Sequence, residues 1–282
     1  MPALPRLDAN RYVQPLREGG SMPAIVDTDD GLYVVKFRGA GQGAKALIAE
    51  LVVAMIAEAL ELPTPSLAII SLAEEFGRSE PDPEIQDLLR ASHGTNIGMR
   101  FLDGAFNYDP TAAADLIDPA FAARVVWLDA FVTNVDRTAR NPNLLIWNRK
   151  PWLIDHGAAL YAHHNWAAVD DARTRTPFPL ISQHVLLRVS DSIASADAFA
   201  TQLLSETLFR DILAQVPDEL LAGDVNSTPE PDANAESAES LRERYVRYLS
   251  TRLETPRAFA DEADGARTSA IAAPPQALKA RR

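Results

Sequence analysis

Residues 134–157 contain the side chains whose types and spacing best suit chemistry. Asp136 lies in a polar loop, Asn143 precedes the strand-like run 144–147, and Asp155 follows a second short strand. A hairpin with an aspartate before it and another at its exit brings two carboxylates and one or two asparagine side chains together. Hard oxygen ligands without histidine or cysteine favour magnesium that holds phosphates. Aspartate and asparagine are also common turn residues, so the pattern is compatible with ordinary turns as well.

A lysine and a glutamate interrupt two apolar segments near the N-terminus. In residues 32–37, LYVVKF, the period-two alternation places Lys36 on a largely apolar strand. Glu50 lies among Leu47 and Leu51 in a run of high helix propensity, so its carboxylate faces buried surroundings. Because a buried carboxylate without a partner is costly, we expect Lys36 and Glu50 to pair. The alternatives are a lysine at a sheet edge and a glutamate that extends to solvent from a helix edge.

The elements around these residues predict an α+β fold. Strand patterns, with a predicted helix over about 44–60, occupy the chain as far as Asp103-Gly104, and helical patterns dominate afterwards. Residues 73–92 have the composition of an exposed loop with a short helix, and Asp118-Pro119 is a helix start signal. Between the first strands, Gly19, Gly20 and Ser21 form a turn that could offer amide donors to a phosphate, although an ordinary hairpin turn explains them equally.

Composition narrows the class of protein. The 282 residues are 47% apolar, enough for a sizeable core, with a formal charge of −12. This charge argues against nucleic acid and an anionic membrane surface as partners. The absence of cysteine excludes disulfides and thiolate chemistry, and with no signal-peptide profile we expect a cytoplasmic protein. We also expect His163 and His164 to be solvated, residues 223–237 to form a loop or disordered insert, and residues 263–282 to form a disordered tail.

The order of these parts resembles the protein-kinase-like fold, and most closely the HipA-like kinases. The motifs that carry the resemblance are GGSMP at 19–23, YVVKF at 33–37, the Ala-Glu pair at 49–50, NVDR at 134–137, and NLLIW followed by WLIDHG within 143–157. The resemblance extends over about residues 11–262. It implies two lobes, a strand-rich N-lobe at 1–102 and a helical C-lobe at 103–262.

The resemblance also implies a role for each site residue. Lys36 would contact the α- and β-phosphates of ATP, Asp136 would act on the acceptor hydroxyl, and Asp155 would hold magnesium. Gly19, Gly20 and Ser21 would approach the nucleotide. The adenine would lie against a hinge, whose residues are Met99, Arg100, Phe101 and Leu102.

Two departures from the family pattern concern the catalytic loop. HipA-like loops resemble NxDxHxxN; Asn134, Asp136 and Asn141 fit this pattern, but Thr138 replaces the histidine. Asn141 has the family's offset from Asp136, whereas Asn143 directly precedes the apolar strand, and we favour Asn143 as the metal ligand. The leading function is therefore phosphoryl transfer from ATP to a hydroxyl of an unknown protein or small molecule. The alternatives are a nucleotide-binding pseudokinase and, last, a two-carboxylate magnesium hydrolase that leaves Lys36 and Glu50 without a role.

Overall fold

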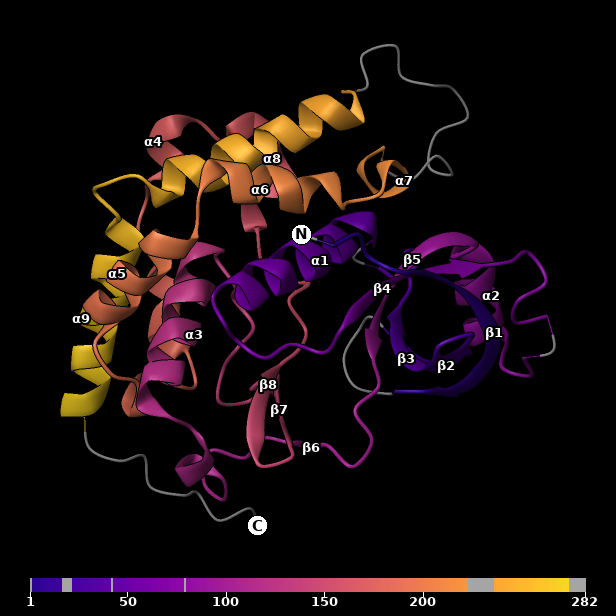
Figure 1. Cartoon of the computed structure of the whole chain (residues 1–282), viewed down its shortest axis with the longest axis horizontal. Coiled ribbons are helices and arrows are strands. Elements are labelled where there is room, and N and C mark those ends of the chain that lie inside the picture. Colours follow the sequence, from indigo (N-terminus) through magenta and orange to yellow (C-terminus); the bar gives the residue numbers. More distant parts are fainter. Residues whose placement is uncertain (1, 17–21, 42, 79, 223–235, 274–282) are drawn as a thin grey trace.

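The computed structural model describes residues 2–16, 22–41, 43–78, 80–222 and 236–273. The chain is a mixed α+β structure with strands concentrated in its N-terminal part and helices in its C-terminal part (Figure 1). The predicted fold class is confirmed at this level. Gly19, Gly20 and Ser21 and most of the predicted insert at 223–237 lie outside the described residues.

Five strands of the N-terminal part close into a barrel in the order β1-β2-β3-β5-β4. Their bounds are β1 Arg6–Pro15, β2 Ala24–Thr28, β3 Gly31–Lys36, β4 Leu67–Leu72 and β5 Gly94–Arg100. All neighbours are antiparallel except β1 and β4, whose parallel pairing closes the barrel. Alternation along β3 buries Tyr33 and Val35 inside the barrel, as the sequence predicts.

Helix α1 (Gly43–Ala59) lies between the barrel and the C-terminal helices (Figure 1). Every residue from Leu47 to Ala57 is buried, which explains why the sequence is apolar around the whole helix. Helix α2 (Pro83–Ala91) covers the barrel with Ile85, Leu88 and Leu89, and Asp82 caps its N-terminus. This confirms the predicted short helix after the loop.

A small sheet follows, made of β6 (Phe106–Asn107), β7 (Leu144–Trp147) and β8 (Lys150–Leu153). Asn148 and Arg149 join β7 to β8 with φ values of 49° and 62°. Positive φ at both central residues is the geometry of a two-residue hairpin turn that matches strand twist. The hairpin predicted between Asn143 and Asp155 is therefore confirmed.

The C-terminal part is built around α3 (Pro119–Phe131), whose residues from Phe121 are nearly all buried and whose N-cap is Asp118. Trp127 and Phe131 of α3 form an aromatic core with Phe209 and Phe259. The remaining α-helices are α4 Asp171–Thr174, α5 Ile193–Leu203, α6 Glu206–Ala214, α7 Asp218–Leu221, α8 Ala238–Leu253 and α9 Ala258–Ala272. Short 3-10 helices are η1 Ala114–Leu116, η2 Tyr161–Ala168, η3 Pro179–Gln183 and η4 Leu187–Val189.

Two expectations about the C-terminal part are wrong for the described residues, and residues 274–282 of the predicted tail lie outside them. Residues 263–272 belong to α9 rather than to a disordered tail, because Phe259 and Ala263 pack into the core and Arg267 donates to the carbonyl of Ser190 at 2.9 Å. His163 is fully buried rather than solvated, because its Nδ1 lies 2.9 Å from the Tyr245 hydroxyl of α8. His164 is exposed, as expected.

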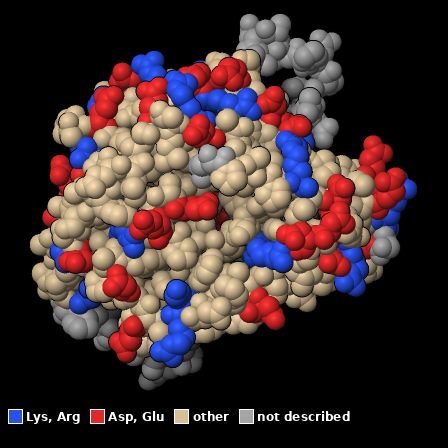
Figure 2. All heavy atoms as spheres, in the orientation of Figure 1, with Lys and Arg blue, Asp and Glu red and all other residues tan. Residues whose placement is uncertain are grey.

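Among the described residues, no helix is both long and apolar enough to span a membrane. On the face shown in Figure 2, acidic and basic side chains are interspersed rather than separated into regions of one sign.

Candidate active site

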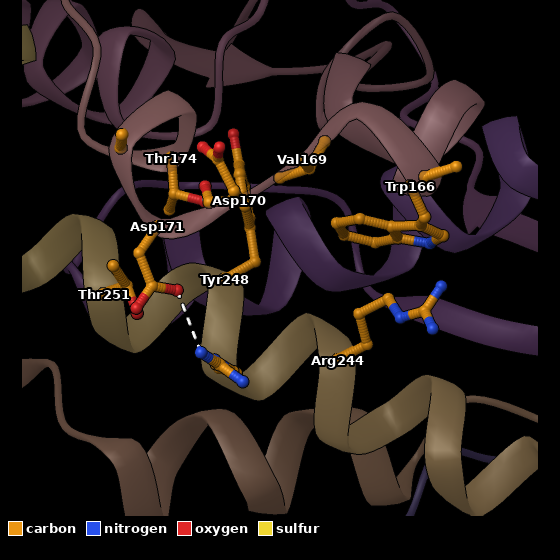
Figure 3. A pocket seen from close by; sticks show the side chains of 11 residues that line it. Trp166, Val169, Asp170, Asp171, Thr174, Arg244, Tyr248 and Thr251 are labelled. Atoms are coloured by element: carbon orange, nitrogen blue, oxygen red, sulfur yellow. Dashed lines mark hydrogen bonds and ion pairs between the residues drawn. The ribbon is translucent and has the colours of Figure 1, made fainter.

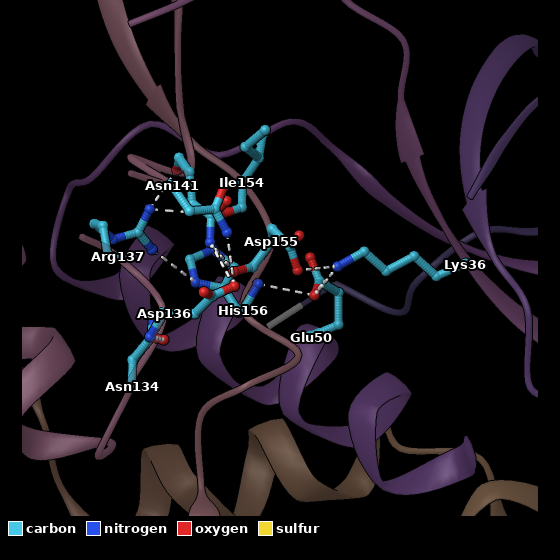
Figure 4. A network of polar contacts seen from close by, with 10 residues as sticks. Lys36, Glu50, Asn134, Asp136, Arg137, Asn141, Ile154, Asp155 and His156 are labelled. Atoms are coloured by element: carbon cyan, nitrogen blue, oxygen red, sulfur yellow. Dashed lines mark hydrogen bonds and ion pairs between the residues drawn. The ribbon is translucent and has the colours of Figure 1, made fainter. Parts of the chain in front are cut away.

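Lys36, Glu50 and Asp155 meet in one ion-pair triad (Figure 4). Lys36 Nζ, at the end of β3, lies 2.7 Å from Glu50 Oε2 of α1 and 2.5 Å from Asp155 Oδ1, just after β8. The three residues come from distant parts of the chain. The expected pairing of Lys36 with Glu50 is confirmed, and Glu50 is 0% exposed.

Burial and the neighbouring charges shift the pKa values of the three triad residues differently. Burial alone would lower the pKa of Lys36, but the two carboxylates outweigh burial and raise it. Burial opposes ionisation of Asp155, yet the Lys36 ammonium holds the pKa of Asp155 below its ordinary value. Burial raises the pKa of Glu50, which Lys36 only partly offsets. One cation therefore serves two carboxylates, and the triad has excess negative charge beside the cleft described below.

Asp136 is surrounded by asparagine side chains rather than by cations. Its Oδ2 accepts from Asn141 Nδ2 at 2.8 Å and from Asn143 Nδ2 at 3.3 Å, and its main-chain N–H donates to Asn134 Oδ1 at 3.0 Å. Asn143 Nδ2 also lies 3.5 Å from the Asp155 carbonyl. The amide of Asn143 therefore lies between the two aspartates. Asn143 has φ of 49°, a conformation that asparagine tolerates better than most residues.

A second group of buried polar residues, here called the Arg137 cluster, consists of Asp129, Arg137, His156 and His184. Arg137 Nε donates to Asp129 Oδ2 at 2.6 Å, and His184 Nε2 lies 2.9 Å from the same oxygen. Arg137 also donates to the carbonyl of Asn143 and lies 3.3 Å from His156 Nδ1. The cluster joins α3, the loop of Asp136, the hairpin and the Asp-His-Gly turn, so it fixes the positions of both aspartates. Figure 4 shows its Arg137 and His156 beside Asp136 and Asp155.

Charges in the Arg137 cluster are balanced. Burial would raise the pKa of Asp129, but Arg137 and His184 hold it well below its ordinary value. Burial and, to a smaller extent, the nearby Arg137 lower the pKa of His156 to about 3, so this imidazole is neutral at physiological pH. Burial also lowers the pKa of His184. One carboxylate faces one guanidinium between neutral imidazoles, away from solvent.

The Arg137 cluster was missed in the sequence. Arg137 follows Asp136 in a polar loop and has the appearance of a solvated charge. Asp129 is an acidic residue within an apolar helix, which is the signal that also identified Glu50. His184 is 55 residues away from Asp129, and nothing in the sequence connects them.

A cleft with a volume of about 990 Å³ lies between the barrel and the hairpin region. It is lined by most of the predicted site residues, namely Lys36, Met99, Arg100, Phe101, Leu102, Asp136, Asn141, Asn143 and Asp155. Glu50 is buried behind Lys36. The Arg100 guanidinium is directed away along the barrel, where it donates to Asp30 Oδ2 at 2.7 Å. The structure thus brings the described candidate residues to one cleft or directly behind it.

A separate groove of about 750 Å³ lies between α4 and α8 (Figure 3). Trp166 and Arg244 line one end, and Arg247 of α8 donates to Asp171 at 3.0 Å across it. None of the candidate site residues that the structure describes lines this groove.

The donors around the cleft fit a magnesium ion with few protein ligands. Asp155 offers a carboxylate that is 41% exposed, and Asn143 or Asn141 offers an amide oxygen. No group of three or more His, Cys, Asp and Glu side chains that could hold a metal occurs among the described residues. Magnesium commonly keeps water and phosphate oxygens as its remaining ligands, so one carboxylate and one amide suit a metal that arrives with a polyphosphate.

Comparisons with known proteins found similarity both in structure and in sequence. Among solved structures, that of a Helicobacter pylori proinflammatory kinase, CtkA, is similar with a TM-score of 0.51 and 13% identity, covering 94% of this chain and 99% of that chain. This likeness shows a shared fold. No curated protein matches the chain. The sequence profile described as HipA-like kinase matches residues 11–247, and the chain therefore belongs to the HipA-like kinase family.

Proposed function

We propose that this protein is a magnesium-dependent kinase that transfers the γ-phosphoryl group of ATP to a hydroxyl of a protein serine or threonine or of a small molecule. In this proposal residues 1–102 form the N-lobe, residues 103–262 form the C-lobe, and the cleft between them holds ATP. The observation that carries the proposal is the meeting of Lys36, Glu50 and Asp155 at a cleft that Asp136 also lines.

The adenine would lie against residues 99–102, where Met99 and Leu102 offer apolar surface to the cleft. The N–H of Phe101 already donates to the carbonyl of Leu32 at 2.9 Å, so it is not the donor to the base. We assign main-chain recognition of adenine to Leu102, whose N–H makes no hydrogen bond within the described parts of the chain.

The chemical roles follow from charge and position. Lys36 would bind the α- and β-phosphates while Glu50 holds its ammonium in place. Asp155 and Asn143 would hold magnesium, with Asn141 as the alternative ligand, and the metal would neutralise charge on the phosphate oxygens. Asp136 would orient or deprotonate the acceptor hydroxyl, since its Oδ1 accepts no hydrogen bond from the described residues.

A nucleotide-binding pseudokinase is the second candidate. Thr138 replaces the histidine of the family loop, and this departure favours a site that binds ATP without transferring phosphate. Both candidates predict nucleotide binding, whereas only the kinase predicts turnover.

Nucleotide binding can be measured as a thermal shift with ATP in the presence and absence of magnesium. We expect a magnesium-dependent shift for the wild type, a much smaller one for Lys36→Ala, and a wild-type shift for Lys150→Ala, an exposed lysine outside the cleft. Absence of a wild-type shift at millimolar ATP would refute both candidates. Transfer of labelled γ-phosphate, to the protein itself or to acceptors in a cell extract, then separates the kinase from the pseudokinase.

A further inference from the structure

Arg140 differs from the other cations that line the cleft, which are Lys36 and Arg100. Lys36 is held by Glu50 and Asp155, and Arg100 is held by Asp30. Arg140 is exposed and makes no ion pair or hydrogen bond with any described residue. It is therefore the uncommitted cation among the described residues that line this cleft.

The backbone at Arg140 is fixed even though its guanidinium is free. The N–H of Thr138 donates to the carbonyl of Asn141 at 3.0 Å, and the N–H of Asn141 donates to the carbonyl of Thr138 at 3.1 Å. These reciprocal bonds close a tight loop around Arg140. Asn141 in turn donates to Asp136 at 2.8 Å, so the base of the Arg140 side chain is held close to the residue that acts on the acceptor.

The excess negative charge around the reaction centre favours an additional cation at this position. With both carboxylates ionised, the triad has a formal charge of −1, from two carboxylates and one ammonium, and Asp136 adds another −1. One divalent metal cancels only this charge and leaves that of the triphosphate. Phosphoryl transfer is accelerated mainly by positive groups placed on the oxygens of the group in transit, and a guanidinium presents paired donors to such oxygens.

We propose that Arg140 is a catalytic residue that binds the equatorial oxygens of the γ-phosphoryl group in the transition state. In this step, which rests on the proposed kinase function, the bond from the γ-phosphorus to the β,γ-bridging oxygen breaks and ADP leaves with that electron pair. A bond from the acceptor oxygen to the γ-phosphorus forms, and the hydroxyl proton passes to Asp136 or to solvent. Arg140 forms no covalent bond and keeps its protons throughout.

The test compares Arg140→Ala and Arg140→Lys with Arg149→Ala, an exposed arginine of the β7–β8 turn that does not line the cleft. ATP affinity, turnover with water and with an acidic protein as the acceptor, and the thermal shift given by ADP, magnesium and aluminium fluoride are measured for each variant. The last mixture imitates a phosphoryl group in transit and reports on Arg140 without turnover.

We expect Arg140→Ala to lower turnover by roughly 10²-fold or more while ATP affinity stays within about threefold. It should also lose most of the extra thermal shift with aluminium fluoride. Arg140→Lys should keep part of the activity, added guanidinium should restore part of it to the Ala variant, and Arg149→Ala should behave as wild type.

Three results would overturn the inference in distinguishable ways. Wild-type turnover in Arg140→Ala would remove Arg140 from the reaction and leave the kinase proposal intact. A loss confined to transfer to acidic protein acceptors, with normal turnover to water, would make Arg140 a determinant of acceptor choice instead. A wild-type protein that neither binds ATP nor turns it over would remove the kinase proposal itself, and this inference with it.

Discussion

The ion-pair triad and the Arg137 cluster are both buried groups of charges, but only one of them is balanced. The cluster matches one carboxylate with one guanidinium and is closed to solvent. The triad places one ammonium between two carboxylates and borders the cleft. They meet where the N–H of His156 donates to Glu50 Oε2 at 2.8 Å. The Arg137 cluster, with balanced charge and no access to solvent, suits a structural role. The triad, with excess negative charge at an open cleft, suits the binding of a cationic ligand.

The largest expected effect concerns stability. Arg137→Met leaves the Asp129 carboxylate buried without its main partner, and breaking such a pair costs about 3–5 kcal/mol. Lys36→Met should cost less, about 1–3 kcal/mol, because Glu50, whose pKa is already raised, can take up a proton. Urea unfolding followed by tryptophan fluorescence at neutral pH measures both losses.

An exposed arginine with two carboxylate partners, Arg210, provides the matched control. Arg210→Met should leave stability close to that of wild type, because solvent already screens these pairs. Equal losses for Arg137→Met and Lys36→Met would break the distinction between a structural cluster and a ligand-binding triad.

A second prediction concerns the pH dependence of the free energy of unfolding. The pKa of His156 falls to about 3 in the folded protein, so below pH of about 6.5 the unfolded chain binds a proton that the folded chain does not. The contribution of neutral His156 to the free energy of unfolding is therefore fully present above about pH 6.5 and is lost as the pH falls towards 3. His156→Phe should reduce the pH slope of the unfolding free energy by up to about 1.4 kcal/mol per pH unit in this window. An unchanged slope would show that His156 is not held neutral by the closed cluster.

The pairing of Lys36 with Glu50 in the triad was predictable from sequence because both residues break a pattern. Lys36 interrupts an apolar strand and Glu50 interrupts an apolar helix, and each needs a partner for physical reasons. The barrel strands, α1 and the hairpin were predictable from periodicity and turn residues in the same way. Such signals are local, and they identify a residue whose surroundings contradict its chemistry.

The Arg137 cluster and the buried His163 depend on long-range packing, so local patterns did not identify them. Arg137 lies in a polar loop, and its burial results from contacts with α3 and the hairpin. His163 is buried because α8 supplies Tyr245, 82 residues further along the chain. The rings of His163 and His164 contact each other, with their Nε2 atoms 3.2 Å apart, and only the tertiary fold determines which of the two is buried.

The smallest expected effect concerns the two asparagines. Asn143 lies within hydrogen-bond distance of both Asp136 and Asp155. Of these two residues, Asn141 contacts Asp136. Asn143→Ala should therefore raise the magnesium concentration needed for ATP binding by about tenfold or more, because loss of a ligand should cost at least as much as loss of an outer-shell partner, which typically costs about 10–100-fold. Asn141→Ala should change it less. The reverse order, from magnesium titrations of both variants, would make Asn141 the ligand.

The most direct test of the kinase proposal compares Asp155→Asn with Asp136→Asn by nucleotide affinity and by turnover. Asp155→Asn should weaken magnesium-dependent ATP binding and abolish transfer together, because it removes the carboxylate assigned to the metal. Asp136→Asn should keep ATP affinity and lose turnover by roughly 10²–10⁴-fold, because its contact with the acceptor matters mainly in the transition state. Undiminished phosphotransfer in Asp136→Asn, or equal loss of ATP affinity in both variants, would contradict the proposed roles.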